Sequence, residues 1–299
     1  MSKSEVKKNR SELPTIKKSS WQILTKFFED VEEAKTGLGF EPGEECFYRG
    51  HRKASYELLP TLQRHCRDAG IKDLVAIQNL ESDLFFEFQA RSAQLDHQSA
   101  NDWDLLLTMR HHGVATRLLD WTETLGVALY FALDGATEQD NPILWLLNPW
   151  KLNEENWSGT RDLIAPRLLG EYQDSKNYED YSDFLLNYDE PGMVLEKPVA
   201  LYPTHLNRRL HAQRGYFTLH GDLNLPLDEL NPCCVAKMDI PSEAIEPARQ
   251  FLALAGIDDY LMFPDLDGLA RDIHRKNRIG MKQSTTTHQP PQQSRGGPA

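Results

Sequence analysis

An apolar helix candidate followed closely by an apolar strand candidate is the feature that most limits the folds open to this chain. Residues 122–133 are rich in Ala and Leu, and 127–133 form an apolar face. After a short polar segment, residues 143–147 read ILWLL. A strand that is apolar throughout is buried on both sides, and an apolar helix must be covered by another layer. The pair therefore predicts a helix packed next to a buried strand.

Other segments extend this mixed pattern. Apolar residues at helical spacing predict helices over 21–31, 74–88, 103–109, 242–255 and 266–278. For the first of these helices, Ser19 or Ser20 is the candidate N-cap and Gly37 the predicted end. Short apolar or alternating runs predict strands over 45–49, 215–220 and 233–240. We expect an α+β fold with mixed helices around small, mainly antiparallel β-sheets.

Composition divides the chain into one large unit with polar ends. We expect a flexible start at 1–14 and a single domain over 15–281. Residues 170–196, with eight acidic side chains and one lysine, predict a solvated acidic insertion. The polar residues 282–299 predict a disordered tail, because they cannot bury enough apolar surface to offset the entropy of ordering.

The net charge, the lengths of the apolar runs and the positions of the cysteines argue against several classes of protein. The chain has 45 acidic and 33 basic residues, a net charge of −12, so any nucleic-acid site must be a local basic patch. The longest apolar runs fall short of the roughly 20 residues that span a membrane, and no membrane partner is expected. The four cysteines show no paired C-x-x-C zinc pattern. We therefore expect a cytoplasmic protein with no metal site.

The segment FYRGH at 47–51 is the first candidate site. Arg49 stands at the end of the predicted strand, and Gly50 permits a close backbone approach. A guanidinium offers five donors in a fixed fork, which suits an anion. The alternative is a structural pair between Arg49 and a carboxylate.

A second candidate lies between Arg110 and Ala132, where two histidines, Thr116, Arg117, Asp120 and Thr122 precede the apolar helix. Such a density of polar groups beside a buried helix indicates either a site or a satisfied internal network. Arg117 and Asp120 are three residues apart and are able to bind one another.

Two further segments carry weaker signals. The basic run 208–214 leads into Tyr216 and Phe217, which suits a stacked nucleotide or, equally, a strand with a polar entry. Asp265 and Asp267 precede a predicted helix. Helix capping is the preferred interpretation for these acids over a metal-binding pair.

Four motifs together resemble the FRG domain family, a mainly microbial group. They are FYRGH at 47–51, HHGVATRLLDWTETLGVALYFAL at 111–133, QRGYFTLHG at 213–221 and FPDLDGLA at 263–270. The central motif departs from the family pattern at three positions, with His111 for Gln, His112 for Tyr and Ala115 for Pro. The resemblance spans about residues 46–271. The contexts in which this family occurs imply a role as a toxin or effector in microbial conflict, including phage defence.

A more distant similarity links Tyr48-Arg49-Gly50 to the first motif of ADP-ribosyltransferases of the arginine–serine–glutamate class. It implies an ADP-ribosyltransferase-like architecture in which Arg49 supports NAD, Thr116 or Thr122 takes the serine-like position and Gln213 lies near the catalytic glutamate. Glutamine lacks the charge that stabilises an oxocarbenium-like transition state. Either Asp120 supplies the charge, or the domain binds a nucleotide without turnover, or the similarity does not extend to function.

The leading hypothesis is therefore an NAD-dependent transferase-like enzyme or a nucleotide-binding effector. Its expected roles are catalysis by Arg49, Asp120 and Gln213, pyrophosphate binding by Arg49 and Arg117, and contacts to nicotinamide or its ribose from His112 or Tyr130. The expected cofactor-binding residues are Arg49, Gly50, His112, Thr116, Arg117, Thr122 and Tyr130.

Two other hypotheses remain open. One is a non-catalytic module that binds nucleic acid or protein through Arg208, Arg209 and Arg214 and through 271–278, with salt-dependent affinity. The other is a metal-dependent hydrolase that uses Asp265, Asp267 and a histidine.

Overall fold

The computed structural model describes residues 18–95, 101–137, 139–159, 161–165, 181–186, 195–202 and 208–277. The predicted flexible start at 1–14 and the predicted tail at 282–299 lie outside these ranges. Of the acidic insertion at 170–196, only 181–186 and 195–196 are described. Within the described ranges, no helix combines the length and apolar character that a membrane crossing needs.

Six strands form one sheet in the order β4-β5-β2-β1-β3-β6, and every neighbouring pair is antiparallel. The strands are β1 (Phe47–His51), β2 (Leu118–Thr122), β3 (Ile143–Leu147), β4 (Val199–Leu201), β5 (Gly215–Leu219) and β6 (Val235–Asp239). The α+β class is confirmed. The expected small sheets are joined into a single one.

The centre of this sheet is weakly joined. β1 and β2 pair at one position only, Tyr48 with Thr122. By contrast, β1 pairs with β3, and β2 with β5, over five positions each. The sheet therefore consists of two three-stranded halves, β4-β5-β2 and β1-β3-β6, which are free to diverge beyond their single point of contact.

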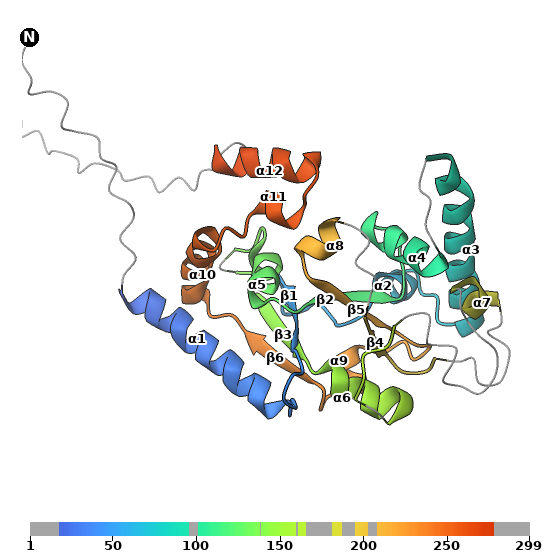
Figure 1. Cartoon of the computed structure of the whole chain (residues 1–299), viewed down its shortest axis with the longest axis horizontal. Coiled ribbons are helices and arrows are strands. Elements are labelled where there is room, and N and C mark those ends of the chain that lie inside the picture. Colours follow the sequence, from blue (N-terminus) through green and yellow to red (C-terminus); the bar gives the residue numbers. More distant parts are fainter. Residues whose placement is uncertain are drawn as a thin grey trace, which may run out of the picture.

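Helices cover both halves (Figure 1). On the β1-β3-β6 half, α1 (Lys18–Gly37), α5 (Leu125–Leu133) and α10 (Ser242–Leu254) share one apolar core. On the other half, a second core includes side chains of α3 (Leu74–Ser92), α4 (Asp102–His111) and α7 (Tyr181–Leu186). A third core lies around Trp121 and Trp145 and includes Leu152 of α6 (Pro149–Asn153) and Leu227 of α9 (Leu227–Leu230). The remaining helical segments are α2 (Thr61–Asp68), η1 (Ala93–Leu95), η2 (Glu154–Ser158), α8 (Arg208–Ala212), α11 (Asp259–Met262) and α12 (Leu266–Lys276).

Three local predictions are corrected. The run 122–133 is not one helix, because Thr122 ends β2 and α5 begins at Leu125. The Thr122 hydroxyl accepts a bond from the Thr124 backbone N–H at 3.1 Å and so shapes the turn between them. Arg49 lies in the middle of β1 rather than at its end. The first helix begins at Lys18, so neither Ser19 nor Ser20 is its N-cap, whereas its predicted end at Gly37 is confirmed.

Gly50 sets the distance between α5 and β1. A Cβ atom at this position would lie 1.9 Å from the Ala128 carbonyl oxygen and 2.5 Å from the Ala132 backbone nitrogen. Because both neighbours are helix backbone, neither is able to rotate away. The glycine is thus required for the approach of a helix, and not only for the approach of a ligand as the sequence suggested.

Candidate functional site: an arginine-rich cleft

A cavity of about 1130 Å³ opens where the two half-sheets meet. It is lined by residues of β1, β2, α4, α5, α8 and α12. Aromatic side chains form part of its wall: Tyr48, Tyr56, Trp121, Phe131, Phe217 and Phe263. A volume near or above 1,000 Å³ suits a ligand of the size of a dinucleotide.

The floor of this cleft holds a carboxylate between two arginines. Arg110 Nε donates to Asp120 Oδ2 at 3.1 Å, and its Nη2 contacts the same oxygen. Arg49 Nη1 lies 3.6 Å from Asp120 Oδ2 and donates to the Asp120 backbone carbonyl at 2.6 Å. Burial alone would raise the pKa of Asp120, but Arg110 and Arg49 outweigh it and hold that pKa below its usual range. One negative charge is therefore shared by two positive ones.

His51 fixes the other side of the Arg49 guanidinium. Arg49 Nε donates to His51 Nε2 at 2.9 Å, so this ring nitrogen must be unprotonated. In this tautomer the other ring nitrogen, Nδ1, carries the proton and donates to the Tyr56 carbonyl at 3.2 Å, and Trp145 Nε1 lies 3.2 Å from the same Nδ1. Burial, together with the charge of Arg49, lowers the pKa of His51 to about 3. His51 thus stays neutral and holds the arginine without competing for its anion.

Three more arginines face the cleft without a carboxylate within ion-pair distance among the described residues: Arg64, Arg209 and Arg271. Arg64 Nη2 donates to the Thr61 hydroxyl at 3.2 Å, while its buried Nε has no partner. The guanidinium carbons of Arg209 and Arg271 lie 4.5 and 3.9 Å from the ring centroid of Phe263. Arg209 and Arg271 are thus held by stacking on Phe263, and none of the three arginines forms an ion pair with a described carboxylate.

Thr122, which forms the single β1–β2 pairing position with Tyr48, lies next to Gln213. The Thr122 hydroxyl donates to the Gln213 backbone carbonyl at 2.7 Å. The Gln213 side-chain amide donates to the Met262 carbonyl at 2.9 Å. Both residues line the cleft, as do Arg49, Gly50, His112 and Asp120. The structure therefore brings together six of the predicted site residues.

Three predicted site residues lie outside the cleft. Arg117 is 2% exposed and donates to both oxygens of the buried Glu81, with Nε distances of 2.7 and 2.9 Å. Thr116 is buried, and its hydroxyl accepts from the Leu118 backbone N–H. Tyr130 donates to Asp259 at 2.5 Å and thereby joins α5 to α11. Their contacts are those of a satisfied internal network rather than of a ligand site.

The basic stretch at 208–214 does not form one surface. Arg209 faces the cleft, whereas Arg214 is paired with Glu123 at 3.1 Å. The side chain of Arg208 and residue 278 lie outside what the structure describes. Of the two aromatic residues that follow, Phe217 lines the cleft and Tyr216 packs on Phe47 at 4.3 Å between ring centroids.

Asp265 is a helix cap, as the sequence favoured. Its carboxylate accepts from the Gly268 backbone N–H at 2.7 Å at the start of α12. Asp267 also lines the cleft. Within the described ranges, these two acids form no metal-binding group with a histidine, so the hydrolase hypothesis has no geometric basis there.

Sequence reasoning missed Arg64, Arg110 and Phe263 as parts of the site. Arg110 immediately precedes the central motif, and Phe263 opens the fourth motif, so adjacency to those motifs was the available signal. Arg64 lies on α2, a helix that the sequence analysis did not predict. No local pattern connects it with the strands.

Comparison with known families confirms the resemblance to the FRG domain for the segment that holds the first two of the four motifs, at 47–51 and 111–133, whereas the motifs at 213–221 and 263–270 lie outside the matched residues. The FRG domain model matches residues 44–141, and this segment is identified as an FRG domain. The matched segment contributes Arg49, Arg64, Arg110 and Asp120 to the cleft. Searches of the curated proteins and of the solved structures found no match.

Proposed function

We propose that the arginine-rich cleft binds a nucleotide with two linked phosphates, and that NAD is the ligand to test first. The observation that carries this proposal is the local excess of positive charge. Among the residues that the structure describes, six arginines line the cleft, Arg49, Arg52, Arg64, Arg110, Arg209 and Arg271, against four aspartates, Asp120, Asp134, Asp265 and Asp267. This excess occurs in a chain whose net charge is −12.

The four aspartates repel a bound phosphate less than their number suggests, because protein groups already engage most of them. Asp120 is bound by Arg110, and Asp134 is paired with Arg275 at 2.8 Å. Asp265 is engaged in its helix cap. Asp267 offsets one more positive charge, which leaves a net positive excess among Arg64, Arg209 and Arg271 to bind oxygen atoms of a ligand. A pyrophosphate offers several such atoms, and the aromatic wall suits a base or a nicotinamide ring.

A second candidate function, ADP-ribosyl transfer from NAD, is favoured by one arrangement. Arg49 on β1, Thr122 at the end of β2 and Gln213, which lies just before β5, come from or next to three adjacent strands and line one cleft. This is the arrangement that the distant similarity implies. Gln213 supplies no negative charge and Asp120 is held between two arginines, so binding without rapid turnover is the better supported function.

Calorimetry with NAD, ADP, AMP and inorganic phosphate tests the binding proposal. We expect ADP and NAD to bind more tightly than AMP, and all of them to bind less tightly as salt is added. Arg271→Ala is expected to weaken NAD binding about 10- to 100-fold, because a hydrogen bond to a charged group contributes about 1.5–3 kcal/mol. Arg91→Ala is the matched control, since Arg91 is 80% exposed on α3 and does not line the cleft. Equal affinities for all four ligands, or no binding, would refute the proposal.

Nicotinamide release and the mass of added ADP-ribose, followed by mass spectrometry, separate the two functions. Wild-type protein is incubated with NAD and a mixture of proteins, DNA and RNA, next to Arg49→Ala. Turnover by the wild type alone would establish transfer and identify the acceptor class. Binding without turnover would make Gln213 the reason for inactivity.

We also propose a cytoplasmic location, because all four cysteines are free thiols. A part in conflict with phages is a proposal that rests on the family resemblance alone. Survival of phage-infected cells that express wild-type protein or Arg49→Ala tests it.

A further inference from the structure

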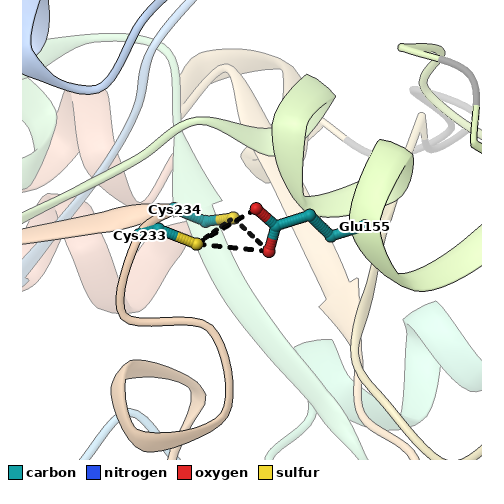
Figure 2. A group of neighbouring side chains, drawn as sticks. All are labelled: Glu155, Cys233 and Cys234. Atoms are coloured by element: carbon teal, nitrogen blue, oxygen red, sulfur yellow. Dashed lines mark hydrogen bonds between the residues drawn. The ribbon is translucent and has the colours of Figure 1, made fainter.

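A second group of reactive side chains lies apart from the cleft (Figure 2). Glu155 of η2 and the adjacent Cys233 and Cys234, which precede β6, place one carboxylate and two sulfur atoms within 4.8 Å of one another. None of the three lines the cleft. Cys234 is buried and Cys233 is exposed, so the group reaches from the core to solvent.

The spacing of the three donors fits a tetrahedral ion. Zinc bonds of about 2.3 Å to sulfur and about 2.0 Å to oxygen, at tetrahedral angles, separate two sulfurs by about 3.8 Å and a sulfur from an oxygen by about 3.5 Å. The two sulfurs here lie 4.0 Å apart. To the same carboxylate oxygen, Glu155 Oε2, the sulfur-to-oxygen distances are 3.2 Å for Cys233 and 3.4 Å for Cys234. Shifts of a few tenths of an ångström bring all three donors onto one ion.

Neighbouring residues hold the carboxylate in position. Asn231, which is 3% exposed, donates to Glu155 Oε2 at 3.3 Å. Asn231 and Asn156 also exchange two side-chain hydrogen bonds of 2.9 Å each. The Cys234 backbone is fixed as well, since its N–H donates to the Asn231 carbonyl at 3.0 Å and its carbonyl accepts from Asn148 at 2.8 Å. Such outer contacts are what orient the ligands of protein metal sites.

We propose that Glu155, Cys233 and Cys234 form a binding site for Zn²⁺ or a similar thiolate-preferring divalent ion. Two thiolates and one carboxylate supply three ligands, and the exposed side of Cys233 leaves the fourth position to water. Thiolate ligands favour zinc over magnesium or calcium. The sequence pattern did not predict this site, because the third ligand lies 78 residues before Cys233.

Metal binding at this site must release protons. In the metal-free protein, the Cys233 and Cys234 thiols both donate to the Glu155 carboxylate. A divalent ion replaces these two hydrogen bonds with two sulfur–metal bonds, and two thiol protons pass to the solvent. The site then carries a net charge of −1 from two thiolates, one carboxylate and the ion.

The test is a zinc titration of the reduced, metal-free, full-length protein, repeated with Co²⁺. We expect one ion per chain, the release of two protons, and sulfur-to-cobalt charge-transfer absorption. Cys233→Ser is the main variant, because this exposed residue can be changed without disturbing the core. It should weaken zinc binding by at least about 100-fold, and Asn231→Ala by about 10- to 100-fold as an outer contact.

Cys66→Ser is the matched control, since Cys66 is a free thiol that contacts none of the three residues. It should leave zinc affinity unchanged. Absence of binding at one ion per chain, or full zinc affinity in the Cys233→Ser variant, would overturn the proposal. Proton release near zero on binding would do so as well, because thiolate ligation requires it.

Discussion

Arg117 and Arg49 both lie beside β2, but their charges are balanced in different ways. Arg117 is 2% exposed and has two carboxylates near it, Glu81 in direct contact and Asp222 at 3.6 Å. Glu81 also accepts from the Tyr181 hydroxyl at 2.5 Å. Arg49 shares one carboxylate with Arg110, and Arg64 adds further positive charge around it.

The difference separates a structural arginine from one that we propose to bind a ligand. A buried charge with all its partners supplied by the protein has nothing left to offer a ligand, whatever motif it belongs to. An arginine whose carboxylate is already engaged elsewhere keeps part of its charge available. For these two arginines, the number of carboxylates within reach is the feature on which the proposed difference in role rests.

The largest loss of stability is expected from breaking the buried ion pair of Arg117 and Glu81, which we call the closed site. Arg117→Ala leaves Glu81 buried and without its cation, which costs about 3–5 kcal/mol of stability. Urea unfolding of the variant and of the Arg91→Ala control measures this loss. A loss below about 1 kcal/mol would mean that the Arg117 network is not the structural element described here.

Arg49→Ala tests the group in the cleft in which Arg49 and Arg110 share the Asp120 carboxylate. It should reduce affinity for NAD about 10- to 100-fold, with a smaller loss of stability than Arg117→Ala, because Asp120 retains Arg110. Arg49→Lys keeps the charge but loses the planar fork, and is expected to recover only part of the binding. Calorimetry and urea unfolding of the same samples provide both values. If Arg49→Ala destabilised the protein as much as Arg117→Ala does, the comparison would fail.

The closed site should also respond to mild acid through His220. This residue is 1% exposed, and burial together with the charge of Arg117 lowers its pKa to about 3. Between that value and the unfolded value of about 6.5, the unfolded chain binds a proton that the folded chain does not. The contribution of His220 to the free energy of unfolding is therefore fully present above about pH 6.5. As the pH falls toward 3, this contribution is lost at up to about 1.4 kcal/mol per pH unit. Unfolding free energies measured across this range for wild type and His220→Gln should show a shallower slope in the variant.

The smallest change in stability is expected at Arg64. Among the described residues, its side chain makes a single hydrogen bond, to Thr61, so Arg64→Ala should alter stability by no more than about 0.5 kcal/mol. Affinity for ADP should nevertheless fall, because Arg64 faces the cleft. A thermal shift assay with and without ADP checks both statements. Loss of the ADP-induced shift with an unchanged melting temperature sharpens the contrast with Arg117.

The sequence predicted elements well where side-chain periodicity alone determines them. The long helix α3 and the buried strand β3 were both recognised from spacing. β2 was missed because its residues continue into the apolar run of α5, and the break between them depends on the Thr122 hydroxyl and the following turn.

The site was only partly predictable for a similar reason. Arg49 and Asp120 stood out as polar residues within apolar segments, and both line the cleft. Arg117 stood out equally, yet its partner Glu81 lies on α3, 36 residues earlier. Nothing local to Arg117 reveals that partner. Distinguishing the two arginines requires the three-dimensional arrangement of the acids.

The single β1–β2 contact has a consequence for how this protein is divided. The segment that matches the FRG domain, 44–141, contains β1 and β2 but ends before β3 begins at Ile143. Cut out alone, it would keep two strands paired at one position and lose both strands that pair with them over five. Two strands joined so weakly are not stable in water. The family boundary is therefore not a folding boundary, and the shortest fragment that keeps the whole sheet must run from β1 through β6.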